Sequence, residues 1–190
     1  MSGFWLMLSE ANTQWVLMAT MLLGLSSGVL GSFALMRKHS LIGDAMAHAA
    51  LPGICLAFMF TGTKSIGLFM VGAACTGLLA AFSIQFITKK SRIKEDTALG
   101  LVLSVFFGVG IVLLTRIAHS PQGNKSGLDH FLFGKAASMV SSDVNVMAGV
   151  SIVLLLVTFI LFKEFKLLSF DPNFGRGIGL PMGLLSLLLM

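Results

Sequence analysis

Five long apolar runs limit what this chain can fold into. Each holds about 20 residues with few charges, and the runs cover residues 15–36, 41–61, 65–88, 97–117 and 143–162. A helix of about 20 apolar residues is long enough to cross the hydrocarbon core of a bilayer, and it satisfies its backbone polar groups internally. The sequence therefore predicts an all-α, polytopic transmembrane protein with about five full spans and the start of a sixth near Pro181.

The composition excludes an ordinary water-soluble protein. The chain is 56% hydrophobic and 11% charged, whereas soluble domains are about 25% charged. The first apolar run follows Glu10 and has no cleavage pattern after it, so we expect a retained span and not a signal peptide. Cys55 and Cys75 fall inside predicted spans without metal-cluster spacing, which favours packing roles. Without a linker or repeat, residues 1–190 are predicted to form a single transmembrane domain.

The basic residues predict how the chain is oriented. Of the 13 Lys and Arg residues, nine lie on one side of the predicted spans and four on the other. The nine are Arg37, Lys38, Lys89, Lys90, Arg92, Lys94, Lys163, Lys166 and Arg176. The positive-inside rule places these nine in the cytoplasm and the N-terminus outside. Because the charges alternate between loops, membrane topology explains the net charge of +5 better than nucleic-acid binding does.

An acid and a histidine lie four residues apart in the second apolar run. Asp44 and His48 share one face of a helix and can point at a common ligand. A carboxylate near the bilayer centre costs about 2.5 to 3.5 kcal/mol on the insertion scale, so such a residue is a candidate functional site. An oxygen and a nitrogen ligand suit Mn, Fe or Zn, although a structural polar pair is the alternative. Gly43 and Pro52 flank the pair, which predicts a broken helix lining a cavity.

The segment 171–181 predicts a short cytoplasmic helix between two spans. An aspartate followed by proline is a helix start, and glycines with a second proline end the helix. The residues in question are Asp171, Pro172, Gly177, Gly179 and Pro181. Phe174 and Ile178 would form one apolar face suited to a groove on another protein. Taken alone, the segment is better explained as a plain interfacial connector.

Together these segments resemble the permease subunits of the metal-ion ATP-binding-cassette importers, which bring manganese, zinc or iron into bacteria. The resemblance covers nearly the whole chain from Trp15 and rests on residues 40–53, 94–100, 128–134 and 170–181, in the family's order. It implies the all-helical fold of the type II importers, with two permeases around a pseudo-twofold pathway in the cell membrane. Cytoplasmic ATP-binding subunits and an extracytoplasmic metal-binding protein are the implied partners. Family members continue with further spans, so the permease domain is expected to be incomplete at its C-terminal end.

The resemblance also assigns residues. The family's pathway metal ligands fall on Asp44 and His48, and two permeases would bring two of each to the axis. The coupling helix, which seats in the ATP-binding subunit, falls on residues 171–179, including Asp171, Pro172, Phe174, Gly177, Ile178 and Gly179. The chain is then a transport subunit and not an enzyme, with a transported metal and no permanently bound cofactor. Residues 127–137 resemble the manganese branch more than the zinc branch.

Two other functions are weighed against this interpretation. An intramembrane hydrolase would also place a metal-binding acid and histidine within the bilayer, but the chain lacks HExxH or a comparable helix motif. An ion-coupled carrier or channel could use the same pair without an ATP-binding partner. The predicted coupling helix distinguishes the importer from the carrier, because a carrier needs no docking helix.

Overall fold

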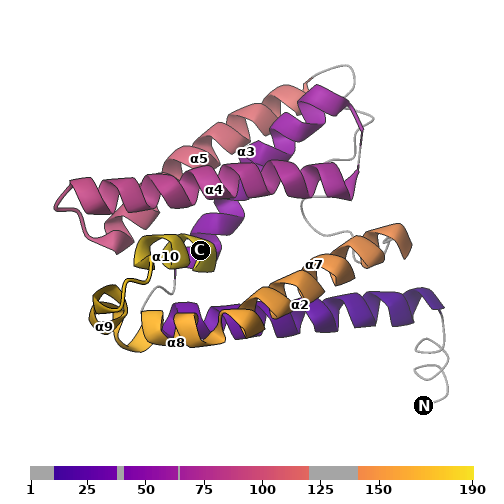
Figure 1. The fold of residues 1–190 in the computed structure, drawn as a ribbon. Helices are drawn as coiled ribbons and strands as arrows, with labels where there is room; N and C mark the ends of the chain where they lie inside the picture. The colour runs from indigo at the N-terminus through magenta and orange to yellow at the C-terminus, as the bar shows by residue number, and fades with distance from the viewer. Residues whose placement is uncertain (1–10, 38–40, 64, 120–140) are drawn as a thin grey trace, which may run out of the picture. The chain divides into compact units, whose positions relative to one another are not determined.

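The computed structural model describes residues 11–37, 41–63, 65–119 and 141–190. Within these ranges the backbone forms eight helices and no strand (Figure 1). The helices are α2 (Ala11–Met36), α3 (Ile42–Thr61), α4 (Ile66–Lys90), α5 (Glu95–Ala118), α7 (Ser141–Ile160), α8 (Phe162–Phe170), α9 (Pro172–Gly177) and α10 (Met182–Leu189). The all-α architecture predicted from the sequence is confirmed.

Five helices in the described part of the chain are long and apolar enough to cross a membrane. They comprise Thr13–Met36, Ile42–Thr61, Ile66–Lys90, Glu95–Ala118 and Asp143–Ile160. These bounds match the five predicted runs to within a few residues. The fifth run differs at its end, because α7 stops at Ile160 and the chain turns at Leu161 before α8 begins. A sixth apolar helix, α10, begins directly after Pro181, as predicted.

The chain divides into two compact units. One unit contains residues 1–30 and 127–162, and the other contains residues 31–126 and 163–190. In the first unit, Val29 of α2 and Phe159 of α7 line an apolar groove of about 420 Å³. The buried hydroxyl of Thr158 is satisfied within its own helix, because it donates to the carbonyl of Leu154 at 2.7 Å. That residues 1–190 form one permease domain stays a prediction.

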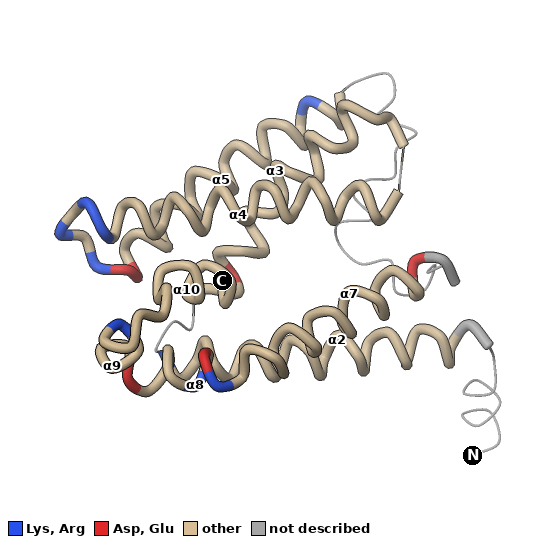
Figure 2. The backbone as a smooth tube through the Cα atoms, in the orientation of Figure 1, with Lys and Arg blue, Asp and Glu red and all other residues tan. Residues whose placement is uncertain are grey.

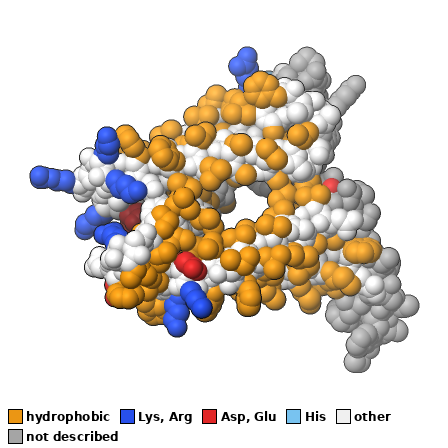
Figure 3. All heavy atoms as spheres, in the orientation of Figure 1, with side chains coloured by type: hydrophobic (Ala, Val, Ile, Leu, Met, Phe, Trp, Pro, Cys, Tyr) orange, Lys and Arg blue, Asp and Glu red, His pale blue; other side chains and the backbone are white. Residues whose placement is uncertain are grey.

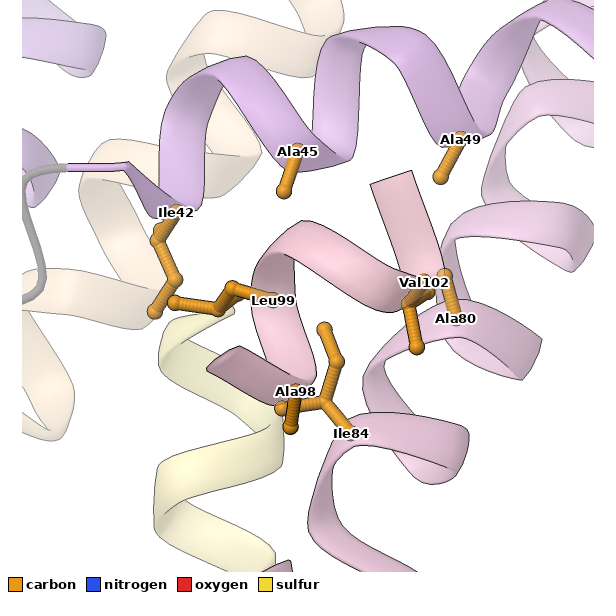
Figure 4. Packing of buried hydrophobic residues seen from close by; sticks show 8 residues of the cluster. All are labelled: Ile42, Ala45, Ala49, Ala80, Ile84, Ala98, Leu99 and Val102. Carbon is orange, nitrogen blue, oxygen red and sulfur yellow. The ribbon is translucent and has the colours of Figure 1, made fainter. Parts of the chain in front are cut away.

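The core of the second unit lies where α3, α4 and α5 meet (Figure 4). It consists of eight buried residues: Ile42, Ala45, Ala49, Ala80, Ile84, Ala98, Leu99 and Val102. Half of these are alanines. Within a bilayer there is no hydrophobic driving force between apolar helices, and small side chains let the helices approach closely and pack. The α3 contributors recur at helical spacing along one face. Phe33 of α2 and Phe165 of α8 form a separate aromatic contact in this unit, with ring centroids 5.8 Å apart.

Charge and hydrophobicity are separated along the helices of the second unit. The connection between α4 and α5 is rich in Lys and Arg, whereas Arg116 lies in the last turn of α5, at the other end of that helix (Figure 2). Apolar side chains cover much of the helix surfaces (Figure 3), and Phe60 of α3 is 87% exposed. This pattern fits helices with lipid-facing sides and polar ends. The orientation of the N-terminus stays a prediction. Four of the basic residues on which it rests lie outside the described residues: Lys38, Lys64, Lys125 and Lys135.

The predicted break in the second span is wrong. α3 runs from Ile42 to Thr61 with Pro52 inside it. The helix ends instead at Gly62, whose φ of 63° suits glycine and whose N–H donates to the carbonyl of Phe58 at 2.8 Å. An apolar helix tolerates proline when its neighbours hold it in place, and Pro52 is buried.

Candidate functional site

Asp44 and His48 lie close together on α3, as their spacing predicts. The Nε2 atom of His48 is 3.4 Å from the Oδ1 atom of Asp44. The side chain of His48 is 38% exposed and that of Asp44 is 62% exposed. The buried residues Ala45 and Ala49 each follow one position later, about 100° around the helix. The core contact of α3 therefore leaves the acid and the imidazole on a neighbouring, accessible face.

The pair lies at one end of α3 and not at its middle. Asp44 belongs to the first turn of the helix, and His48 to the next turn. The expectation of a carboxylate near the centre of its span is therefore wrong, because α3 begins only two residues before Asp44. At this position the partial positive charge of the helix N-terminus stabilises the carboxylate.

Phe107 of α5 packs against the ring of His48. The two rings meet edge to face, with centroids 4.7 Å apart and planes inclined by 71°. Such aromatic contacts contribute roughly 0.5–1.5 kcal/mol beyond burial. Phe107 could not be linked to the site from the sequence, because it lies 59 positions after His48. The contact depends on α3 packing against α5.

One chain supplies two of the ligands that a metal ion needs. Among the described residues, no group of three or more His, Cys, Asp or Glu side chains is placed to hold a metal ion. Transition metals in proteins usually take at least three protein ligands or fill the shell with water. The Asp44–His48 pair can therefore offer one oxygen and one nitrogen, with the remaining ligands coming from elsewhere.

The short helix predicted after the fifth span is present as α9. Asp171 caps it, because its Oδ1 atom accepts a hydrogen bond from the backbone N–H of Phe174 at 2.9 Å. Pro172 is the first residue of the helix and Gly177 the last. Gly179 follows with a φ of 83°, a conformation that glycine adopts at little cost.

Phe174 and Ile178 are both exposed, at 58% and 57%. Two large apolar side chains one turn apart thus remain uncovered within the described part of the chain. This arrangement is compatible with the predicted docking role, which stays a prediction.

A family model matches residues 9–190 of the chain, and its description is the ABC 3 transport family. The chain belongs to this family. It is 60% identical over 187 residues to the manganese transport system membrane protein MntC of Bacillus subtilis, covering 98% of the chain and 43% of that relative. It is 41% identical over 181 residues to the zinc transport system membrane protein TroC of Treponema pallidum, covering 95% of the chain and 61% of that relative.

A solved structure supports the family's fold for this chain. PsaBC from Streptococcus pneumoniae in complex with Fab matches with a TM-score of 0.76 and 35% sequence identity. The match covers 96% of this chain and 64% of that one. The chain therefore spans 43% to 64% of the length of these relatives. These matches confirm the resemblance to metal-ion importer permeases and the polytopic helical fold. Residues 127–137, which resemble the manganese branch, lie outside the described residues.

Proposed function

We propose that this chain is part of the membrane-spanning permease of an ATP-driven importer of divalent transition-metal ions. The observation that carries the proposal is the Asp44–His48 pair, with its atoms 3.4 Å apart on an accessible face of α3. A carboxylate oxygen and an imidazole nitrogen suit Mn, Fe or Zn. Relatives named for manganese and zinc transport support the same substrate class.

The proposed pathway needs a second permease. Because one chain offers two ligands, a second copy or a related permease facing it would raise the number to four, and water could complete the shell. An incomplete shell suits transport, since the ion has to leave the site again. The metal is therefore cargo, and no cofactor is held permanently.

ATP hydrolysis is assigned to a separate cytoplasmic subunit, so the chain itself is not an enzyme. The segment from Asp171 to Gly179, with Phe174 and Ile178 exposed, is proposed to seat in that subunit and to transmit its motion. In the predicted orientation, with the N-terminus outside the bacterial cell membrane, this segment faces the cytoplasm. An extracytoplasmic metal-binding protein would deliver the ion on the other side. The relatives favour this importer over an ion-coupled carrier or channel.

Manganese is the proposed substrate, with zinc and iron as the other members of the class. A site of oxygen and nitrogen ligands holds Zn more tightly than Mn at equilibrium. Selection of manganese would therefore come from geometry, from transit kinetics or from the external binding protein. Measuring cellular Mn, Zn and Fe after deletion of the gene identifies the substrate, because only the transported metal should fall.

Uptake by two ligand variants tests the pathway. In the complete transporter, Asp44→Asn and His48→Ala should each lower manganese uptake by roughly tenfold or more, because loss of a group that merely supports a ligand already costs about 10–100-fold. Asp96→Asn and His119→Ala are matched controls, since both side chains are exposed at the ends of α5. Membrane insertion and assembly should be unchanged in all four variants.

Each result has a defined meaning. Uptake near the normal rate in Asp44→Asn and His48→Ala would remove the pathway assignment. Normal uptake without any co-purifying ATP-binding subunit would instead favour the carrier or channel.

A further inference from the structure

A cavity with several charged side chains in its wall lies in the second unit, near α9 but apart from the Asp44–His48 pair. Its volume is about 460 Å³, which falls within the roughly 300–1,000 Å³ of ligand pockets. The ends of several helices form its wall. The polar residues that matter here are Arg37, Gln85, Lys89, Glu95, Arg176 and Ser186.

The cavity carries excess positive charge. Arg37, Lys89 and Arg176 line it together with Glu95, which gives three cations against one carboxylate. Arg37 is half-buried, and its Nη1 atom donates a hydrogen bond to the Oγ atom of Ser186 at 2.9 Å. Burial lowers the pKa of the Arg37 guanidinium, and the Glu95 carboxylate raises it in part. Because a guanidinium stays protonated in proteins, a bound anion would recover solvation that Arg37 has lost.

Further hydrogen bonds join residues that line the cavity. The Nε2 atom of Gln85 donates to the carbonyl of Gly183 at 2.5 Å, which ties α4 to α10. The Nζ atom of Lys89 lies 3.4 Å from the Oε1 atom of Gln85, so this ammonium is held beside the cavity. A preformed wall lowers the entropic cost of binding a ligand.

We propose that this cavity binds a phosphate group. A planar guanidinium and a flexible ammonium are the two side chains that recognise phosphate oxygens, the first bidentately and the second as a point charge. Glu95 repels a highly charged anion, which favours a singly charged phosphodiester. Basic pockets at the cytoplasmic ends of membrane helices bind the headgroups of anionic phospholipids. Free phosphate offers the same chemistry.

Binding is tested with the complete transporter, purified in phosphatidylcholine nanodiscs, by the rise in its thermal unfolding midpoint on titration. The probes are short-chain phosphatidylglycerol and inorganic phosphate, at constant ionic strength. Lys89→Gln, at an exposed site, should weaken binding about fivefold, as expected for an ion pair near 1 kcal/mol. Arg37→Gln should weaken it further. Lys90→Gln is the matched control, because it removes the same charge one residue away, where the ammonium lies 5.4 Å from the ring centre of Phe86.

The two probes show whether the bound phosphate belongs to a lipid headgroup or is the free anion, and the variants test whether the cavity binds it. A response to phosphatidylglycerol alone identifies a lipid headgroup, and a response to inorganic phosphate identifies the free anion. If the Arg37→Gln variant does not fold, the comparison of binding by Lys89→Gln and Lys90→Gln still tests the proposal. The proposal is overturned if neither probe binds, or if Lys90→Gln weakens binding as much as Lys89→Gln.

Discussion

The close approach of α3 and α4 gives the sharpest prediction about stability. The two helices cross at Gly53 and Gly72. A Cβ atom on Gly53 would lie 2.6 Å from the carbonyl carbon of Gly72, and closer still to its oxygen and to the hydroxyl of Thr76. A Cβ atom on Gly72 would lie 3.0 Å from the carbonyl carbon of Gly53. Because carbon atoms in contact are about 3.5–4.0 Å apart, Gly53→Ala has to separate the helices by roughly 1 Å.

The expected cost follows from that displacement. A gap of about 0.5–1 Å forfeits a quarter to a half of the dispersion energy of each affected contact. Overpacking of this kind typically costs about 1–3 kcal/mol. The higher helix propensity of alanine returns up to about 1 kcal/mol. We therefore expect Gly53→Ala to lower the free energy of unfolding by about 1–2 kcal/mol.

Gly77→Ala is the matched control for this prediction. It lies on α4, and an added Cβ atom there would meet nothing within 4 Å. For a chain of this length about 1 kcal/mol shifts the unfolding midpoint by roughly 2–4 °C. In detergent, Gly53→Ala should unfold several degrees below the unmodified chain, and Gly77→Ala at or slightly above it. Equal midpoints for the two variants would refute the reasoning that these helices touch through their backbones.

Three further predictions address the candidate sites. Asp171→Ala removes the cap of α9 at a cost of about 1 kcal/mol, so amide hydrogen exchange in α9 should accelerate roughly fivefold, and unchanged exchange would contradict the cap. Phe107→Ala frees the His48 ring, so the KM for manganese should rise about two- to tenfold in the complete transporter, and an unchanged KM would deny Phe107 a positioning role. In a chain without native cysteines, an impermeant maleimide should label His119→Cys in intact cells and Ser91→Cys only after permeabilisation. The reverse pattern would invert the orientation.

Much of the fold could be predicted because a bilayer imposes one dominant requirement on sequence. An apolar helix has to be about 20 residues long, so hydrophobic length alone locates the spans. The short helix α9 was predictable for a different reason. Asp171 and Pro172 form a local start signal whose hydrogen bond closes within three residues, and Gly179 supplies the positive φ that follows.

The surroundings of the candidate site could not be predicted in the same way. Asp44 and His48 share a helix, so their proximity follows from spacing. Phe107 reaches His48 only because α5 packs against α3. Gly53 meets Gly72 only because α4 also packs against α3. In a membrane, nearly every face of a span is apolar, so the hydrophobic pattern does not mark which face meets a neighbour.

Pro52 shows why the break predicted in the second span does not occur. Proline has no backbone N–H to donate to the carbonyl four residues earlier, which here belongs to His48. In water that carbonyl would recruit solvent and the helix would tend to break, at a cost of about 3 kcal/mol. In α3 the proline is buried within a helix that continues to Thr61. Pro52 therefore leaves the helix intact and removes only the hydrogen bond that its N–H would have donated to the carbonyl of His48, a residue of the candidate site.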